Sequence, residues 1–327
     1  MTNPSLTAAG QRGMAIISAL LIAAVVAVIA GGMLARQTVF TRSLEAEQSR
    51  VQGAWLLRGG LELGRQLLWD ARQHDPLTRL DQAWARPLSA AGLSERGGQF
   101  SGQMEDDQGK FNLRNLVRDS RVDPDQVRAF QQLCESIGIK PAVGQRIVQR
   151  VTAAYSLLPD NAPVAPVVKG SFDSGRLTSP GTTLKPLPAS RPMLHSLDDL
   201  GAVAGVDDAA LALLAPHVTI LPANTWVNGN TASAEVLASQ VPGLSLSRAR
   251  SLVAERDAGR WFINRGDFVN RLRMPELVVS DIKVGITSDW FRLNARSRSD
   301  SRRVSLAALL YRQELQMPQV IWSRVGV

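Results

Sequence analysis

Three histidines are the side chains of this chain best suited to acid–base or metal chemistry at neutral pH. His74, His195 and His217 lie far apart in the sequence, and none has a second metal ligand at the spacing of a zinc site. The sequence also lacks a nucleophile elbow, a phosphate-binding loop and a zinc-protease helix. The single Cys134 cannot form an internal disulfide and is expected in an apolar core. We therefore expect that the chain is not an enzyme.

A second candidate for chemistry is a short helical hairpin near the C-terminal third of the chain. Residues 241–253 read VPGLSLSRARSLV, which resembles a helix-hairpin-helix motif. In DNA-binding versions, the backbone N–H groups of a glycine-rich hairpin cradle a phosphate, and nearby arginines add ionic contacts. Four arginines could supply such contacts here: Arg248, Arg250, Arg256 and Arg260.

Two readings of this hairpin remain open. The NGNTA segment at 228–232 also occurs in competence proteins built on the motif, and the formal net charge of +8 permits a polyanionic partner. Against DNA binding, Ser245 stands where the second hairpin glycine would let a phosphate approach. The simpler reading is that the hairpin packs two helices through Leu237, Val241, Leu252 and Val253.

The element that decides where this chain resides is an apolar run near its N-terminus. Residues 14–34 carry no charge, and Ser18 is the only polar interruption. A helix of this length spans roughly 30 Å, the thickness of a bilayer core. Arg12 before the run weakly places residue 1 in the cytoplasm, so that everything after Arg36 would lie on the other side of the membrane. A buried core helix and a secretory signal with small residues at 28–30 are the alternatives.

The order of residues before the apolar run resembles the prepilin peptidase site of type IV pilins and pseudopilins. Gly13 directly precedes the apolar run and follows Arg12. The resemblance implies that the prepilin peptidase cleaves after Gly13, removes residues 1–13 as a leader, and leaves Met14 as a methylated N-terminus. Residues 14–35 would then be the membrane-spanning part of a long helix.

The fifth mature position departs from the general pilin pattern. Most pilins carry a glutamate there, and the resemblance implies that it pairs with the terminal amine of a neighbouring subunit. In this sequence the position is Ser18. A subunit without this carboxylate would be poor at adding beneath an existing subunit, yet could sit at the top of a filament.

An apolar stripe continues beyond the membrane segment and predicts one helix from Met14 to about Ala71. Its members recur at three-, four- and seven-residue steps: Phe40, Leu44, Val51, Ala54, Leu57, Leu61 and Leu68. We expect Phe40, Leu44, Val51 and Ala54 to contact partner subunits, unless they pack on this chain's own sheet. Gly59, Gly60 and Gly64 weaken the helical pattern locally.

The remainder of the chain predicts a helical block between strands. Residues 98–113 suggest a hairpin, and 123–158, 197–214 and 232–272 suggest helices, with Pro124 in a first turn. Residues 159–192 are proline-rich and suggest a loop, while 286–295, 304–311 and 319–324 suggest strands. The predicted fold class is α+β: a long N-terminal helix on a small antiparallel sheet (36–113 and 284–327), with a helical domain inserted at 114–283.

This layout resembles the K-type minor pseudopilins of type II secretion, a family known for lacking the pilin glutamate. The resemblance covers nearly the whole chain through ordered blocks: GKFNLRNL at 109–116, RPMLHSLDDL at 191–200, VTILP at 218–222, NGNTA at 228–232 and ITSDWFRLNA at 286–295. It implies a single-pass inner-membrane protein with its bulk in the periplasm, at the tip of the secretion pseudopilus. Its partners would be the I-, J- and H-type minor pseudopilins and the prepilin peptidase. The alternative is a membrane-tethered DNA-binding protein of the competence type.

The same resemblance makes a structural calcium ion plausible. Asp106 with Asp107, and Asp123 with Asp125, are clustered oxygen ligands of the kind that calcium uses. Aspartates at turns and helix starts more often cap the local backbone, so the sequence assigns no calcium ligands.

Overall fold

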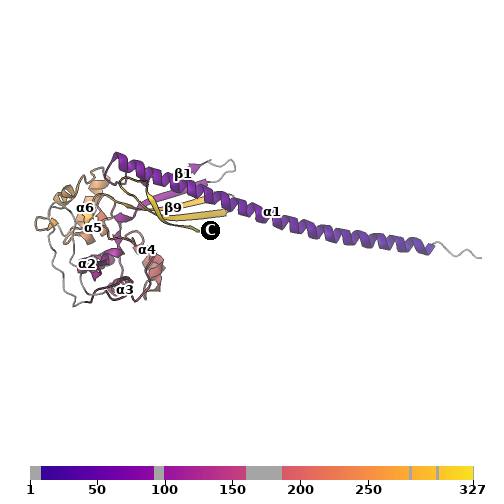
Figure 1. Ribbon diagram of the computed structural model, residues 1–327, viewed down its shortest axis with the longest axis horizontal. Coiled ribbons are helices and arrows are strands. Elements are labelled where there is room, and N and C mark those ends of the chain that lie inside the picture. Colours follow the sequence, from indigo (N-terminus) through magenta and orange to yellow (C-terminus); the bar gives the residue numbers. More distant parts are fainter. Residues whose placement is uncertain (1–8, 92–98, 160–185, 280–281, 300–301, 327) are drawn as a thin grey trace, which may run out of the picture.

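The computed structural model describes residues 9–91, 99–159, 186–279, 282–299 and 302–326. Helix α1 (Ala9–His74) is continuous over 66 residues, or about 100 Å. Figure 1 shows its first half projecting from the folded head and its second half lying along a sheet. In the part described, α1 is long and apolar enough to cross a membrane, and none of its most apolar window is buried. The reading of residues 14–34 as a buried core helix is therefore wrong.

The second half of α1 packs on one face of a five-stranded antiparallel sheet. The strand order is β1-β2-β9-β10-β11. The strands are β1 (Leu88–Ala91), β2 (Gln99–Asp106), β9 (Trp290–Ser299), β10 (Arg302–Tyr311) and β11 (Gln319–Gly326). Along β9 and β10, apolar side chains alternate with exposed ones, so the apolar set faces α1. This is the pilin-like head that the sequence predicts.

Glycines in α1 let the helix approach this sheet closely. Gly53, Gly60 and Gly64 are buried, and a Cβ atom placed on each would meet Val304, Phe100 and Met104, respectively. Gly60 and Gly64, which weaken the helical pattern in the sequence, are thus positions where α1 has no room for a side chain against the sheet. Leu57, Leu61 and Leu68 of the same helix are buried in this core.

The hairpin predicted for residues 98–113 is wrong. Strand β2 leads into a short 3-10 turn (Asp107–Gly109) and then β3 (Phe111–Asn112), and these segments do not pair with each other. β2 pairs with β1 and β9, while β3 pairs in parallel with β6 (Val218–Thr219). The physical reason is burial: Phe100 and Met104 face the α1 core, which only the distant β9 completes.

The segment between the head strands forms a mainly helical second body with its own core. Its helices are α2 (Pro124–Ser136), α3 (Pro141–Thr152), α4 (Asp208–Leu214), α5 (Ala234–Gln240), α6 (Leu246–Asp257) and α7 (Arg265–Leu272). Two-residue strands complete it: β4 (Val117–Arg118), β5 (Arg121–Val122), β6, β7 (Val227–Asn228) and β8 (Val284–Gly285). Figure 1 shows α2 to α6 at the end of the sheet farthest from the projecting half of α1.

The single helix predicted for residues 123–158 is two helices. Pro124 does occupy the first turn of α2, and Asp123 caps it by accepting the amides of Asp125 and Gln126. The helix is then interrupted between α2 and α3 by Gly138, which has a φ of 85°, and by Pro141. Most of the predicted proline-rich loop, residues 160–185, lies outside the described residues.

Candidate functional site

The start of α1 holds the expected processing position. Gly13 and Met14 both lie within α1, and Met14 is exposed. Ser18 is one turn further along, and its hydroxyl donates a hydrogen bond to the Met14 carbonyl at 3.0 Å. This bond is the usual way in which a serine satisfies its hydroxyl inside an apolar helix.

The four residues predicted to contact partners are exposed and lie outside the buried core that α1 shares with the sheet. Phe40, Leu44 and Val51 are 68%, 60% and 44% exposed, and Ala54 is exposed as well. At 100° per residue, Leu44 and Val51 lie on the side of α1 opposite Gly53 and Gly60. Phe40 and Leu44 are far from the core of the sheet, whereas Val51 and Ala54 border its edge, and the partner role of all four stays a prediction.

The predicted stripe therefore divides into two faces. A seven-residue repeat drifts by about 20° per heptad on a straight helix, and three-residue steps turn it further. The stripe consequently winds from an exposed face at Phe40 and Leu44 to the sheet at Leu57 and Leu68. This rotation is why the stripe, taken as one face, mixes residues with different roles.

Sequence reasoning missed Trp55 as a member of the exposed face. Trp55 is 66% exposed and follows Val51 by one helical turn. With Val51 and Ala54 it borders a groove of about 510 Å³ between α1 and the sheet edge, where Leu306 of β10 and Val320 and Val325 of β11 form the other wall. An exposed tryptophan beside such a groove is a typical anchor residue of protein interfaces. Its signal in the sequence is the spacing 40, 44, 51, 55.

The helix-hairpin-helix segment is folded as a packing element. Leu237, Val241, Leu244 and Leu252 are buried, and Val253 is partly buried. Ser245 caps α6 by accepting the amide of Arg248. The hairpin thus joins α5 to α6 through an apolar core, as the simpler reading of the sequence predicts.

The arginines of this segment are engaged within the chain. Arg248 donates to the carbonyl of Arg271 at 2.8 Å, and Arg250 pairs with Glu235 at 3.3 Å. Arg256 is 3% exposed and donates to the carbonyls of Gly229 and Ala232. Arg260 lies 3.6 Å from Glu255. Arg248 and Arg256 are thus used inside the chain, while Arg250 and Arg260 form exposed ion pairs.

Three of the four aspartates considered for calcium, Asp106, Asp107 and Asp123, are held by hydrogen-bond donors of the chain, and Asp125 pairs with Arg128 at the surface. Asp106 is buried and accepts from the hydroxyls of Thr231 and Ser288, from the Asn228 side chain and from the Gln108 amide. Asp107 binds Arg292 at 2.7 Å, and Asp123 caps α2. Within the described ranges, no three histidine, cysteine or acidic side chains are grouped as metal ligands.

Asp106 instead stands at the junction of the head and the helical domain. Thr231 and Asn228 come from the helical domain, while Ser288 precedes β9. The Asn228 amide also reaches the carbonyl of Thr78, just after α1, and Arg312 donates to the Thr78 hydroxyl and the Ser288 carbonyl at 2.6 Å each. Burial raises the pKa of Asp106 and lowers that of Arg312 to about 10. Sequence reasoning missed this network because its members are up to 234 residues apart.

The histidines are not brought together. His74 donates from Nδ1 to the Asp70 carbonyl at 2.7 Å, His217 contacts the Ser233 hydroxyl at 3.0 Å, and His195 lies in another loop. Burial lowers the pKa of His217, and burial also raises the pKa of the Cys134 thiol to about 12. A thiol with such a pKa is protonated and inert at neutral pH.

A long apolar anchor helix that continues onto an antiparallel sheet defines a pilin-like, single-pass membrane-anchored protein. Family models described as "Type II secretion system (T2SS), protein K" match residues 109–223 and 227–287. Type II secretion system protein K of Pseudomonas aeruginosa is 31% identical over 313 residues, covering 93% of this chain and 89% of that protein. The chain belongs to the type II secretion system protein K family.

Two further comparisons agree with this assignment. Type II secretion system protein K of Klebsiella pneumoniae is 29% identical over 262 residues, covering 77% of each chain. Among solved structures, the crystal structure of the GspK-GspI-GspJ complex from the enterotoxigenic Escherichia coli type 2 secretion system contains a similar chain. The TM-score is 0.60 at 18% identity, with 86% of this chain and 99% of that chain covered. The likeness supports the α+β pseudopilin fold.

Proposed function

We propose that this protein is a structural subunit at the tip of a type II secretion pseudopilus and supports protein export across the outer membrane. Its partners are other minor pseudopilins of the I, J and H types, and its role is assembly and not catalysis. The observation that carries the proposal is the exposed apolar face of α1 formed by Phe40, Leu44, Val51, Ala54 and Trp55. Side chains of this kind cost free energy in water unless a partner covers them.

The proposed location is the inner membrane, with the head in the periplasm. The basic Arg12 before the apolar run supports a cytoplasmic N-terminus, because positive residues are retained on that side. Processing by the prepilin peptidase would cut between Gly13 and Met14. Mass spectrometry of membrane-extracted protein should then find Met14, methylated, as the first residue. A mature start at Gly31 would mean a secretory signal and would contradict the pilin reading.

The assembly proposal is tested by copurification of the other minor pseudopilins with Leu44→Arg and Val51→Arg. Both positions are exposed, so the head should fold normally while a buried arginine at the interface is strongly unfavourable. Leu63→Arg is a matched control, because Leu63 is 45% exposed on another side of the same helix. Normal copurification of the Leu44 and Val51 variants, or equal loss with Leu63→Arg, would contradict the proposed face.

A structural calcium ion remains a proposal without assigned ligands. If calcium stabilises this chain, a chelator should lower the unfolding temperature of the purified protein, and added calcium should restore it. An unchanged unfolding temperature would contradict a structural role for calcium.

A further inference from the structure

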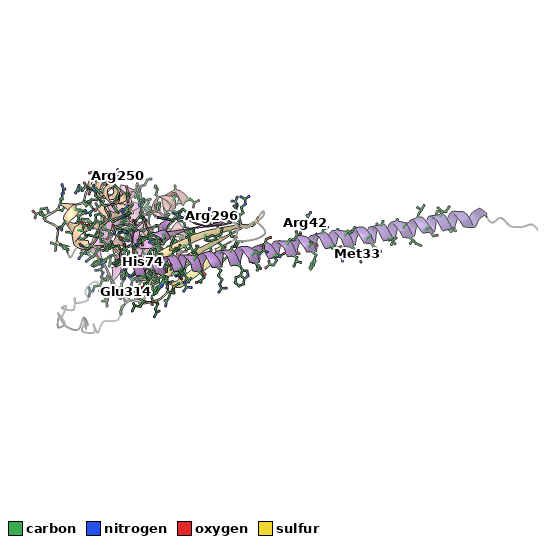
Figure 2. The ribbon with its side chains drawn as sticks, turned by 90° about the horizontal axis from the view of Figure 1, so that it is seen from above. Met33, Arg42, His74, Arg250, Arg296 and Glu314 are labelled. Atoms are coloured by element: carbon green, nitrogen blue, oxygen red, sulfur yellow. The ribbon has the colours of Figure 1, made fainter. Side chains whose placement is uncertain are left out.

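The uncovered face of the sheet carries a group of arginines at the end nearest the membrane anchor. Arg296 and Arg298 on β9 and Arg303 on β10 are exposed, and they point away from the face that α1 covers. We call these three residues the sheet-end arginines. Figure 2 shows Arg296 at the end of the head that lies toward Arg42 and the projecting half of α1.

The sheet-end arginines make no ion pair with any residue in the described part of the chain, whereas many other arginines do. Arg298 and Arg303 are moreover directly opposite each other in the antiparallel register. Like charges at opposed positions of neighbouring strands are destabilising. Among the described residues this pair has no counter-charge, and an external anion would supply one.

The position of these arginines can be measured along α1. Val304 and Ser297 lie against Gly53 on α1. The opposed arginines Arg298 and Arg303 are one residue further along their strands, toward the membrane anchor. At 1.5 Å per residue, that level is about 25 Å beyond Leu34, where the apolar run ends. The headgroup layer occupies roughly 5–8 Å of this span. Membrane helices tilt by up to about 40°, and a tilt of α1 toward the sheet side would remove most of the remaining distance between the arginines and the headgroups.

Two features of α1 are compatible with such a tilt. Gly31 and Gly32 form a pair at the end of the apolar run, and a Cβ atom placed on either would meet nothing within 4 Å. Glycine pairs are sites where helices bend. Arg36 and Arg42, both exposed, lie between this pair and the head and add positive charge on the path to the membrane surface.

We propose that Arg296, Arg298 and Arg303 bind the anionic phospholipid surface of the membrane in which the chain is anchored. The contact holds the head inclined toward the bilayer while the subunit is free in the membrane. The contact is electrostatic, so it weakens as the ionic strength rises. This inference concerns the free subunit and does not depend on its place in a filament.

A lipid surface fits these residues better than an acidic protein does. The side chains between the arginines are small and polar, among them Gln99, Ser101 and Ser305. Protein interfaces are anchored by buried aromatic or aliphatic side chains, and the described residues at this end of the face include none. A layer of phosphates needs no such anchor, because it is recognised by charge alone.

The test uses the full chain reconstituted in vesicles, with a fluorescent donor on Gln99→Cys and acceptor-labelled headgroups. Gln99 is exposed opposite Arg298, and the buried Cys134 is not expected to react with the label. Energy transfer should be higher in phosphatidylcholine vesicles containing about one third phosphatidylglycerol than in phosphatidylcholine alone. The difference should disappear at about 0.5 M NaCl and in the triple variant Arg296→Glu, Arg298→Glu, Arg303→Glu.

The matched control reverses three exposed arginines of the helical domain, Arg128→Glu, Arg191→Glu and Arg260→Glu, with the same change in net charge. It should keep the phosphatidylglycerol-dependent transfer. Equal transfer in both vesicle types, or an equal loss in the control triple, would overturn the proposal. If the lipids make no difference but the sheet-end variant loses copurification of the other minor pseudopilins, an acidic protein is the partner instead. Circular dichroism of both triples verifies that they are folded.

Discussion

The Phe100 ring lies directly against the backbone of Gly60, so that a Cβ atom on Gly60 would come within 2.1 Å of Phe100 Cζ. The same ring lies close to Gly102, where a Cβ atom would meet Phe100 Cζ at 3.1 Å. Phe100 is only 5% exposed and is thus held between two glycines, one on α1 and one on its own strand. This contact fixes the distance between α1 and the sheet.

Gly60→Ala should destabilise the head, although alanine is the better helix former. Overpacking in a filled core costs about 1–3 kcal/mol, which exceeds the roughly 1 kcal/mol gained by replacing glycine within a helix. Denaturant unfolding of the detergent-solubilised chain measures the change. Gly59→Ala is the control, since a Cβ atom there meets nothing within 4 Å, and it should stabilise the protein. A Gly60→Ala variant as stable as Gly59→Ala would contradict this account.

Asp106→Ala should destabilise the junction between head and helical domain by about 3–5 kcal/mol. The change removes the acceptor of Thr231, Ser288 and Asn228 and leaves the buried Arg312 without its attraction to the carboxylate. Burial is the largest cause of both pKa shifts: it raises the pKa of Asp106 against its hydrogen bonds, and it lowers the pKa of Arg312 against the attraction of Asp106.

A double-mutant cycle with Arg312→Met checks this coupling. Removing both charges should cost clearly less than the sum of the two single changes, because no uncompensated buried charge remains. Strict additivity of the unfolding free energies would show that the two residues are independent.

The stability of the helical domain should fall as the pH decreases through the range just below the ordinary pKa of histidine, about 6.5. Burial lowers the pKa of His217, so the unfolded chain binds a proton that the folded chain does not. Stability is therefore complete above this range and is lost on acidification toward the lowered pKa. Unfolding midpoints at about pH 7.5 and pH 5.5 should differ less in His217→Gln than in the wild type. The exposed His74→Gln should retain the wild-type difference.

Local patterns predicted the elements of this fold better than their pairing. The charge-free run at 14–34, the capped start of α2 at Asp123 and Pro124, and the strands near 290–311 follow from periodicity and turn chemistry. The strand that pairs with β2 cannot be derived in this way, because Phe100 and Met104 indicate only that one face of β2 is buried. Which strand completes that face is decided by β9, nearly two hundred residues later.

The candidate site shows the same division. Gly13, Met14 and Ser18 are recognised by their order along the chain, and the exposed face at Phe40 and Leu44 by its spacing. The rotation of the stripe onto the sheet at Leu57 depends on small drifts that a pattern of apolar letters does not resolve. The Asp106 junction needs side chains from five separate segments, so only the folded chain brings it into view.

Filament position should depend on Ser18, the fifth residue of the mature chain after cleavage at Gly13. The Ser18 hydroxyl donates to Met14 within its own helix and carries no charge, so it cannot neutralise the terminal amine of a subunit above. An unpaired ammonium in lipid costs about 3 kcal/mol or more, and a further subunit should therefore dock poorly on top. Ser18→Glu should raise the number of copies per pseudopilus, measured by quantitative mass spectrometry of sheared filaments. Ser43→Glu, an equal change at an exposed serine outside the apolar run, should leave that number unchanged. Immunogold labelling should find the wild-type chain only at filament ends, and labelling along the shaft would refute the capping role.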